Sequence, residues 1–328
     1  MDSTLPLRLA SHQMEARPET SFAEEVCLPF LRNAQNKDGG WGFHPKSESR
    51  VEPTCWALQA LGESSDREAQ DGRARGLQFL RAAQLVDGSW PSTPEQKSGC
   101  WVTALSCWVL AREDFSPALA AGLQWLCHDW PQDSTPWRRF LAKFSSHKDL
   151  QPINMALRGW GWTPGTSSWV EPTSFALISL KLAPPDQRPS EADRRRELAE
   201  ALLYDRMCPG GGWNSGNPRV YGVSGEPLVI PTVWALLALG DQPARHENVM
   251  SLDWLESNVA NIGSAGSLAL ARICMETYGR RLAANGPVFS DLYERNGFLE
   301  SVPVAAWTCL ALGPRARWLV SARADVTQ

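Results

Sequence analysis

Two short segments of the sequence place a glutamate where it could take part in acid–base chemistry. Arg50-Val51-Glu52-Pro53-Thr54 recurs 119 positions later as Trp169-Val170-Glu171-Pro172-Thr173. An apolar run follows each segment, so its Pro is expected at the first position of a helix, where a missing N–H costs nothing. The helix dipole favours the charged form of a glutamate there, which predicts that Glu52 and Glu171 are ionised. They could act as acid–base or cation-stabilising groups, or they could only stabilise helix ends.

These segments belong to a longer internal repeat. Gly40-Trp41-Gly42-Phe43 recurs as Gly159-Trp160-Gly161-Trp162, again 119 positions later. Gln35–Trp41 also matches Gln84–Trp90 at an offset of 49, and Gly210–Trp213 is a degenerate copy. Agreement between separated segments predicts a repeated structural unit.

Each unit combines an amphipathic helix, a Gly-rich turn with a Trp, a polar loop and an almost wholly apolar helix. A helix that is apolar all round must be buried on every side, so the second helix of each pair is expected inside the first. The expected outer helices cover residues 20–35, 68–84, 115–129, 191–207, 246–259 and 284–295. The expected inner helices cover residues 53–62, 102–112, 172–182, 231–240, 264–279 and 303–313.

The terminal units carry no obvious polar caps, so the stack is expected to close on itself. The predicted fold is all-α: one α/α toroid, or barrel, of about six helical hairpins over residues 19–314. Residues 1–18 are expected to be a flexible N-terminal segment and residues 315–328 a C-terminal tail. Residues 131–156 are an insertion, interpreted as a lid, a membrane-surface contact or, more simply, an extra turn on the rim. The long loop 213–232 is a second candidate lid.

The inner helices of such a barrel run the same way, so their N-termini gather at one mouth. Glu52 and Glu171 would face each other obliquely across it. Other polar candidates at the mouth are His44, Arg50, Tyr221, Glu226 and Glu300. Aromatic candidates for the wall of a substrate cavity below it are Trp56, Trp101, Trp108, Phe175, Trp234 and Trp307. Aromatic faces stabilise cations and suit apolar ligands, although such rings also fill cores.

Composition narrows the class of protein. The chain has 328 residues and a formal net charge of −4, which argues against a nucleic-acid partner. No run approaches the ~18 apolar residues of a membrane span, and no apolar signal segment is seen near the N-terminus. The eight cysteines are scattered without a CxxC pair, which favours buried thiols. A cytoplasmic location is therefore expected.

The complete Gln-x-x-x-Gly-x-Trp segments at Gln35–Trp41 and Gln84–Trp90 resemble the QW repeat of squalene and terpene cyclases. Protein prenyltransferase β subunits share the related barrel. The resemblance covers about residues 20–314. It implies that the motif Trp residues are structural braces at the ends of outer helices.

The resemblance also places Glu52 and Glu171 where these cyclases carry an Asp-x-Asp-Asp-Thr motif, which supplies the proton that starts the reaction. The first Asp of that motif is replaced by Arg50 or Trp169, and the last by Pro in both copies. A lone glutamate is a poor donor to an alkene, which demands an unusually strong acid.

Three functions follow as hypotheses. The first is a terpene-cyclase-like enzyme that binds an isoprenoid or similar apolar substrate in the barrel and cyclises or isomerises it without a cofactor. Most such cyclases enclose the site between two α/α domains, so a homodimer or partner chain would have to close this mouth. The second is a non-catalytic module that binds a lipid, peptide or protein partner.

The third hypothesis is a zinc-dependent prenyltransferase or peptide cyclase. The chain has no Asp-x-Cys, the pair with which prenyltransferase β subunits hold zinc. Cys127-His128 matches the zinc ligands of lanthipeptide cyclases superficially, but adjacent residues point apart on a helix. No metal ligands are therefore predicted.

Overall fold

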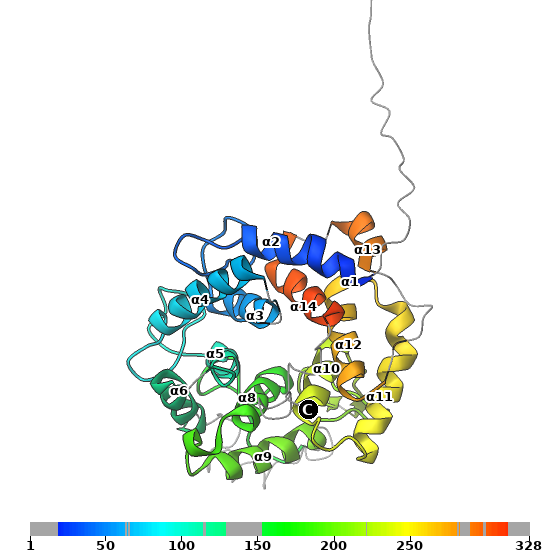
Figure 1. Ribbon diagram of the computed structural model, residues 1–328. Coiled ribbons are helices and arrows are strands. Elements are labelled where there is room, and N and C mark those ends of the chain that lie inside the picture. Colours follow the sequence, from blue (N-terminus) through cyan, green and yellow to red (C-terminus); the bar gives the residue numbers. More distant parts are fainter. Residues whose placement is uncertain are drawn as a thin grey trace, which may run out of the picture.

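Two concentric rings of helices surround one axis in the computed structural model (Figure 1). The structure describes residues 19–62, 64, 66–113, 116–128, 153–220, 222–280, 282, 289–297 and 300–313. The predicted N-terminal segment and C-terminal tail lie outside the described residues, as do residues 131–152 of the predicted insertion.

The inner ring is closed. Its helices are α3 (Val51–Leu61), α5 (Val102–Leu110), α8 (Val170–Leu182), α10 (Val229–Ala238), α12 (Ala265–Thr277) and α14 (Val302–Leu312). Each contacts the next, and α14 packs against α3, so the last repeat meets the first. The predicted all-α toroid is confirmed.

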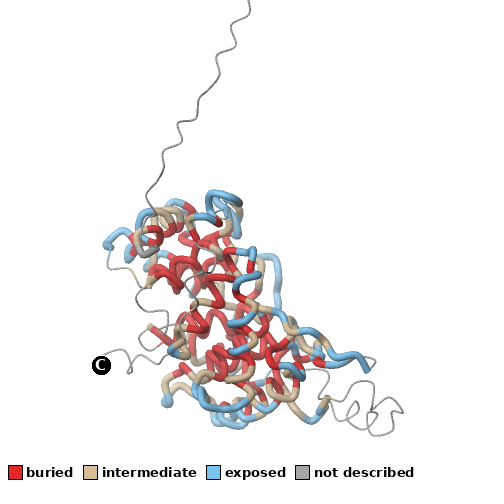
Figure 2. The backbone as a smooth tube through the Cα atoms, turned by 90° about the vertical axis from the view of Figure 1, so that its right-hand side faces the viewer, coloured by how far each residue is buried: buried red, intermediate tan, exposed pale blue. Residues whose placement is uncertain are grey.

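The outer ring begins with α1 (Glu19–Phe22), the π-helix η1 (Ala23–Cys27) and α2 (Leu28–Asn33) in succession. It continues with α4 (Arg67–Ala82), α6 (Pro117–His128), α9 (Ala192–Asp205), α11 (His246–Asn258) and α13 (Phe289–Asn296). Short 3₁₀ turns, η3 (Pro185–Gln187) and η4 (Val259–Asn261), lie between helices. Buried residues follow the inner helices, whereas exposed residues lie on loops and outer helices (Figure 2).

The loop 213–232 contains a small antiparallel hairpin. Strands β1 (Arg219–Val220) and β2 (Val223–Ser224) pair, with Arg219 opposite Ser224. Val223 is 70% exposed. The hairpin therefore extends into solvent instead of joining the core.

Proline does not open the inner helices as expected. α3 and α8 begin two residues before their Pro, at Val51 and Val170, so Pro53 and Pro172 are third in their helices. The expectation of Pro at the first position was wrong because every N–H of the first turn lacks an intrahelical acceptor, so Pro is tolerated throughout that turn. Each glutamate is consequently the second residue of its helix.

Four tryptophans brace the repeats in the same way. The indole Nε1–H of each donates to the carbonyl of a leucine at the end of an outer helix, over 2.6 to 2.9 Å. The backbone N–H of each donates to a buried threonine near the start of an inner helix, over 2.9 to 3.0 Å. These brace tryptophans are Trp41, Trp90, Trp160 and Trp213, and all are at most 2% exposed.

The glutamine that precedes a brace tryptophan joins two repeats. Gln35 Nε2 donates to the carbonyls of Gly39 and Gly72, both over 2.8 Å. Gln84 repeats this with Gly88 and Ala118. Gly39 has a φ of +89°, a left-handed conformation that glycine adopts without strain. The turn thus needs both its Gln and its Gly.

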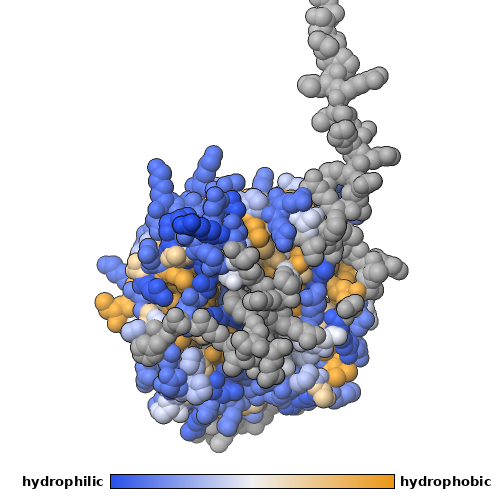
Figure 3. Space-filling view, in the orientation of Figure 1, coloured by the Kyte–Doolittle hydropathy of each residue, from blue (hydrophilic) through white to orange (hydrophobic). Residues whose placement is uncertain are grey.

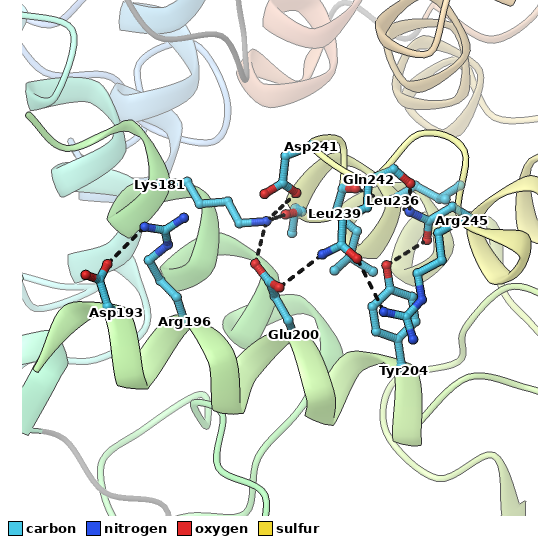
Figure 4. Close-up of polar contacts among 12 residues, drawn as sticks. Lys181, Asp193, Arg196, Glu200, Tyr204, Leu236, Leu239, Asp241, Gln242 and Arg245 are labelled. Carbon is cyan, nitrogen blue, oxygen red and sulfur yellow. Dashed lines mark hydrogen bonds and ion pairs between the residues drawn. The ribbon is translucent and has the colours of Figure 1, made fainter.

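A polar network fastens the third repeat to the fourth at the end where the inner helices finish (Figure 4). Lys181 at the end of α8 donates to the Ala238 carbonyl over 2.8 Å and pairs with Glu200 over 2.9 Å and Asp241 over 2.6 Å. In the orientation of Figure 1, hydrophilic residues cover much of the described surface, with smaller hydrophobic areas between them (Figure 3). This network fixes the spacing of α8, α9 and α10.

Candidate active site

The mouth of the toroid is built from the loops that follow the brace tryptophans. A residue just before each of α3, α5, α8 and α10 donates its N–H to a brace carbonyl, as Arg50 does to Trp41 over 2.9 Å. Loops also bind the neighbouring repeat through backbone hydrogen bonds. These join Val302 N–H to Phe43 O (2.9 Å), Trp101 N–H to Trp162 O (3.2 Å) and Val170 N–H to Ser215 O (3.0 Å). The first of them closes the ring between the first and sixth repeats.

Glu52 and Glu171 are largely withdrawn from water. Glu171 is 9% exposed and Glu52 is half-buried. Burial raises the pKa of Glu52 to about 7, although the Trp56 side chain favours the ionised form. Burial also raises the pKa of Glu171, partly offset by hydrogen bonds from its own backbone and from Ser215. The helix dipole was expected to favour the charged form of both groups, and the net pKa shift goes the other way because desolvation outweighs the dipole.

Glu171 reaches a neighbouring repeat through one hydroxyl group. Ser215 Oγ donates to Glu171 Oε1 over 3.3 Å. The other oxygen, Oε2, is buried without a hydrogen-bond partner among the described residues. A buried oxygen without a partner favours the protonated carboxyl.

Within the described residues, Arg50 forms ion pairs with carboxylates other than Glu52. Its guanidinium pairs with Glu48 over 2.6 Å and with Glu95 over 3.4 Å. Both of these carboxylates are more than half exposed. Arg50 therefore joins the first loop to the second at the surface.

The other predicted polar residues lie toward the rim. His44 Nδ1 is 2.9 Å from the backbone carbonyl of Glu300, a second contact between the first and last repeats. The side chains of Glu226 and Glu300 are exposed, in contrast to Glu52 and Glu171. Tyr221 lies outside the described residues. The structure thus separates two buried carboxyls from two exposed ones.

The predicted aromatic residues meet on the axis. Trp56 lies 5.3 Å from Trp234 in a stacked arrangement and 5.4 Å from Trp307 edge to face, measured between ring centroids. Phe175 lies 5.0 Å from Trp234. Such separations mean direct ring contact. The rings of Trp56, Trp108, Phe175 and Trp234 are at most 4% exposed. Their part in substrate binding stays a prediction.

Trp101 carries the aromatic cluster to the mouth. It is half-buried, 5.5 Å from Phe175 and 5.1 Å edge to face from Trp162. Trp162 and Ser215 were not among the predicted site residues. Each lies two positions after a brace tryptophan, so aligning the repeats position by position would have drawn attention to both.

The metal hypothesis receives no support from the described part of the chain, where no three His, Cys, Asp or Glu side chains are grouped to hold an ion. Burial raises the pKa of the Cys127 thiol to about 11. His128 Nδ1 is 2.8 Å from the Gln124 carbonyl of its own helix. In the described residues, no helix is long and apolar enough to cross a bilayer.

The sequence resembles curated terpene cyclases in part, although no protein-family model matches it. A drimenyl diphosphate synthase of Streptomyces showdoensis is 25% identical over 264 residues, 68% of this chain and 48% of that enzyme. One of Streptantibioticus cattleyicolor is 42% identical over 67 residues, 20% of this chain and 12% of that enzyme. Lanosterol synthase of Homo sapiens is 34% identical over 88 residues, 23% and 12% of the two chains. The chain spans about half or less of these relatives.

Solved structures share the fold. The type II terpene cyclase MstE from Scytonema, without ligand, has a TM-score of 0.60 at 12% identity and covers 91% of this chain and 98% of its own. A variant bound to its substrate geranylgeranyl dihydroxybenzoate has a TM-score of 0.58 at 13% identity, covering 92% and 98%. An α-1,6-mannanase from Salegentibacter has a TM-score of 0.56 at 9% identity, covering 93% and 100%.

This chain therefore has the α/α toroid fold of these terpene cyclases, as its repeats predicted, and is similar to terpene cyclases in parts of its sequence. The mannanase shows that the same fold also serves unrelated chemistry. The fold alone therefore does not define an activity.

Proposed function

We propose that this protein is a terpene cyclase-like enzyme that isomerises or cyclises an isoprenoid at the mouth of the toroid. Glu52 and Glu171 are its acid–base groups. The observation that carries the proposal is a pair of carboxyls withdrawn from water at the starts of inner helices, Glu171 buried and Glu52 half-buried. Burial raises the pKa of both, that of Glu52 to about 7. A group with that pKa both gives and takes a proton near neutral pH, which is the optimum for general acid–base catalysis.

The acidity of this group selects the kind of step. A carboxyl with a pKa near 7 is too weak to protonate an isolated alkene readily. It suits an isoprenoid with an oxygen function, such as an epoxide, whose oxygen takes the proton while a C–O bond opens. Loss of a proton from a neighbouring carbon restores the carboxyl, so the reaction needs no oxidant, reductant or cofactor.

The aromatic residues complete this proposal. Positive charge that develops on the substrate would lie above Trp101 and Trp162, whose rings are half-buried at the mouth. Cation–π contact is worth about 0.5 to 2 kcal/mol, depending on desolvation. Phe43, in the loop after Trp41, and Ile230, at the start of α10, expose 41% and 39% of their surfaces. The proposal therefore includes a second copy of this chain, or a partner chain, that covers these residues.

A product assay tests the enzyme. Purified protein is incubated with squalene, oxidosqualene, farnesyl diphosphate and geranylgeranyl diphosphate, and the products are dephosphorylated, extracted and identified by gas chromatography with mass spectrometry. We expect a new isomeric product, reduced about 100-fold or more in Glu52→Gln or Glu171→Gln, because glutamine cannot transfer the proton. Glu197→Gln on the exposed face of α9 is the control and should leave the rate unchanged.

The competing hypothesis is the non-catalytic binding module, which is favoured by the direct contacts among Trp56, Phe175, Trp234 and Trp307 because these rings pack on one another. Folded protein that binds farnesol but converts none of the four substrates would support it and contradict the enzyme.

A further inference from the structure

A cavity of about 590 Å³ opens at the mouth between the third and fourth repeats. Its lining residues are Ile153, Met155, Ser167, Ser168, Trp169, Arg206, Asn214, Ser215, Gly216, Asn217 and Leu228. The N-cap residues of α8 and α10 and the C-cap residue of α9 are among them. Its volume is typical of small-molecule sites. The aromatic rings meet on the axis, and the cavity lies to one side of it.

The lining has one apolar side and one polar side. Trp169 and Leu228 are 39% and 52% exposed, although large apolar side chains normally gain by burial. Arg206 is only 3% exposed and pairs with the neighbouring Asp205. Ser215 and Asn214 add neutral polar groups beside it. The combination suits a ligand with a long apolar chain and an oxygen-bearing end.

A proton donor lies directly behind the polar side. Ser215 lines the cavity and also donates to Glu171 Oε1 over 3.3 Å. Glu171 is 91% withdrawn from solvent, and its Oε2 has no partner within the described chain. A single hydroxyl group therefore separates a buried carboxyl from the cavity.

The seam that holds the cavity is fixed at its far end. Lys181 and Glu200 join α8 to α9 there, and Asp241 belongs to the turn after α10 (Figure 4). At the mouth, Val170 N–H donates to the Ser215 carbonyl over 3.0 Å. Ser215 is thus held by its backbone while its hydroxyl remains at the boundary between Glu171 and the cavity.

We propose that this off-axis cavity is the isoprenoid site and that Ser215 passes a proton between Glu171 and the oxygen of the ligand. In the relay, the protonated Glu171 carboxyl is the donor across the 3.3 Å contact with Ser215 Oγ. As Ser215 Oγ accepts that proton it gives its own to the ligand oxygen, and a C–O bond of the ligand opens. A proton lost from a neighbouring carbon then returns through Ser215 to the Glu171 carboxylate, which restores both groups. Trp169 and Leu228 hold the apolar chain. The relay rests on the proposed function, whereas the binding site can be tested without it.

Gly216→Leu tests the site by filling it. A Cβ at Gly216 would meet only Trp169 Cε3 at 3.8 Å and Ser168 O at 3.9 Å, which are ordinary contacts. Gly210→Leu is the matched control, because a Cβ there meets nothing within 4 Å. Neither glycine has a left-handed φ. Farnesol binding is measured by isothermal titration calorimetry, and melting curves check that the variants fold.

We expect the wild-type protein and Gly210→Leu to bind farnesol equally and Gly216→Leu to bind at least about tenfold more weakly. Leu228→Lys, at an exposed position that does not threaten the fold, should weaken binding similarly. Ser215→Ala should keep its affinity for farnesol and lose about tenfold or more of the turnover.

The outcomes separate the two proposals. If Gly216→Leu and Leu228→Lys bind farnesol as tightly as wild type, the proposed site is wrong, even where the wild-type protein turns over substrate. The site is also wrong if the wild-type protein binds no farnesol. Affinity lost in these variants without turnover on any substrate supports the site and contradicts the enzyme. If Ser215→Ala turns over substrate at the wild-type rate, the proposed relay is wrong.

Discussion

At the scale of single residues, Glu52 couples folding to pH. Its pKa is about 7 in the folded protein and 4.5 ordinarily, so the folded state prefers the neutral form. Its stabilising effect is therefore complete below about pH 4.5 and is lost as pH rises through about 7. Glu52→Gln keeps a neutral side chain at every pH. We expect it to unfold like wild type at pH 4.5 but to be more stable by about 1–3 kcal/mol at pH 8.5, measured with urea.

All other titrating groups are the same in wild type and Glu52→Gln, so their contributions cancel in the difference between the two unfolding free energies. A difference that stays constant between pH 4.5 and pH 8.5 would contradict the raised pKa of Glu52, and with it the basis of the proposed acid.

The sequence revealed Glu52 and Glu171 because their surroundings are duplicated. It could not reveal the direction of their pKa shifts, because that depends on how far loops from other repeats exclude water. Aligning the repeats would have drawn attention to the position of Ser215, but not to its contact with Glu171, because that contact joins two repeats.

At the scale of elements, the Gln–Gly–Trp turn depends on space as well as on conformation. A Cβ at Gly39, with its φ of +89°, would lie 2.6 Å from the Arg75 carbonyl oxygen. Gly165 has a φ of +73° but open space around a Cβ. We expect Gly39→Ala to cost about 2–4 kcal/mol of unfolding free energy and Gly165→Ala only about 1 kcal/mol. Urea unfolding measures both, and equal losses would show that conformation alone decides.

Helix positions were predictable because each apolar run must be buried. The inner helices begin within about two residues of their expected starts; α3, for example, begins at Val51 and was expected to begin at residue 53. The start itself was misjudged because Pro fits any position of a first turn. The start of the expected helix 284–295 lies outside the described residues, and its end agrees within one residue with that of α13 at Asn296.

At the scale of the whole molecule, closure was predictable and the filled axis was not. Terminal repeats without polar faces need partners, and α14 and α3 supply them to each other. Whether Trp56, Trp234 and Trp307 line a chamber or meet depends on side-chain directions that periodicity does not specify. They meet in direct ring contact, which is why the proposed ligand site is the cavity between the third and fourth repeats.

Closure also determines how the molecule opens. In an open stack, the terminal repeats have one neighbour and fray first. Here α3 and α14 each have two neighbours in the inner ring, and Val302 N–H and His44 add hydrogen bonds between the first and last repeats. We expect native-state hydrogen exchange to give amides of α3 and α14 the same opening free energy as those of α8 and α10, within about 1 kcal/mol.

The outer helix α13 is the internal control, because its buried side chains are few: Phe289 and Leu292. It should exchange by local opening at a much lower free energy. If α3 and α14 exchanged with α13 while α8 and α10 stayed protected, the ring would behave as an open stack. The seam between the third and fourth repeats would then be the stable centre of the molecule, and the first-repeat Glu52 would belong to a part that opens, where its raised pKa could not persist.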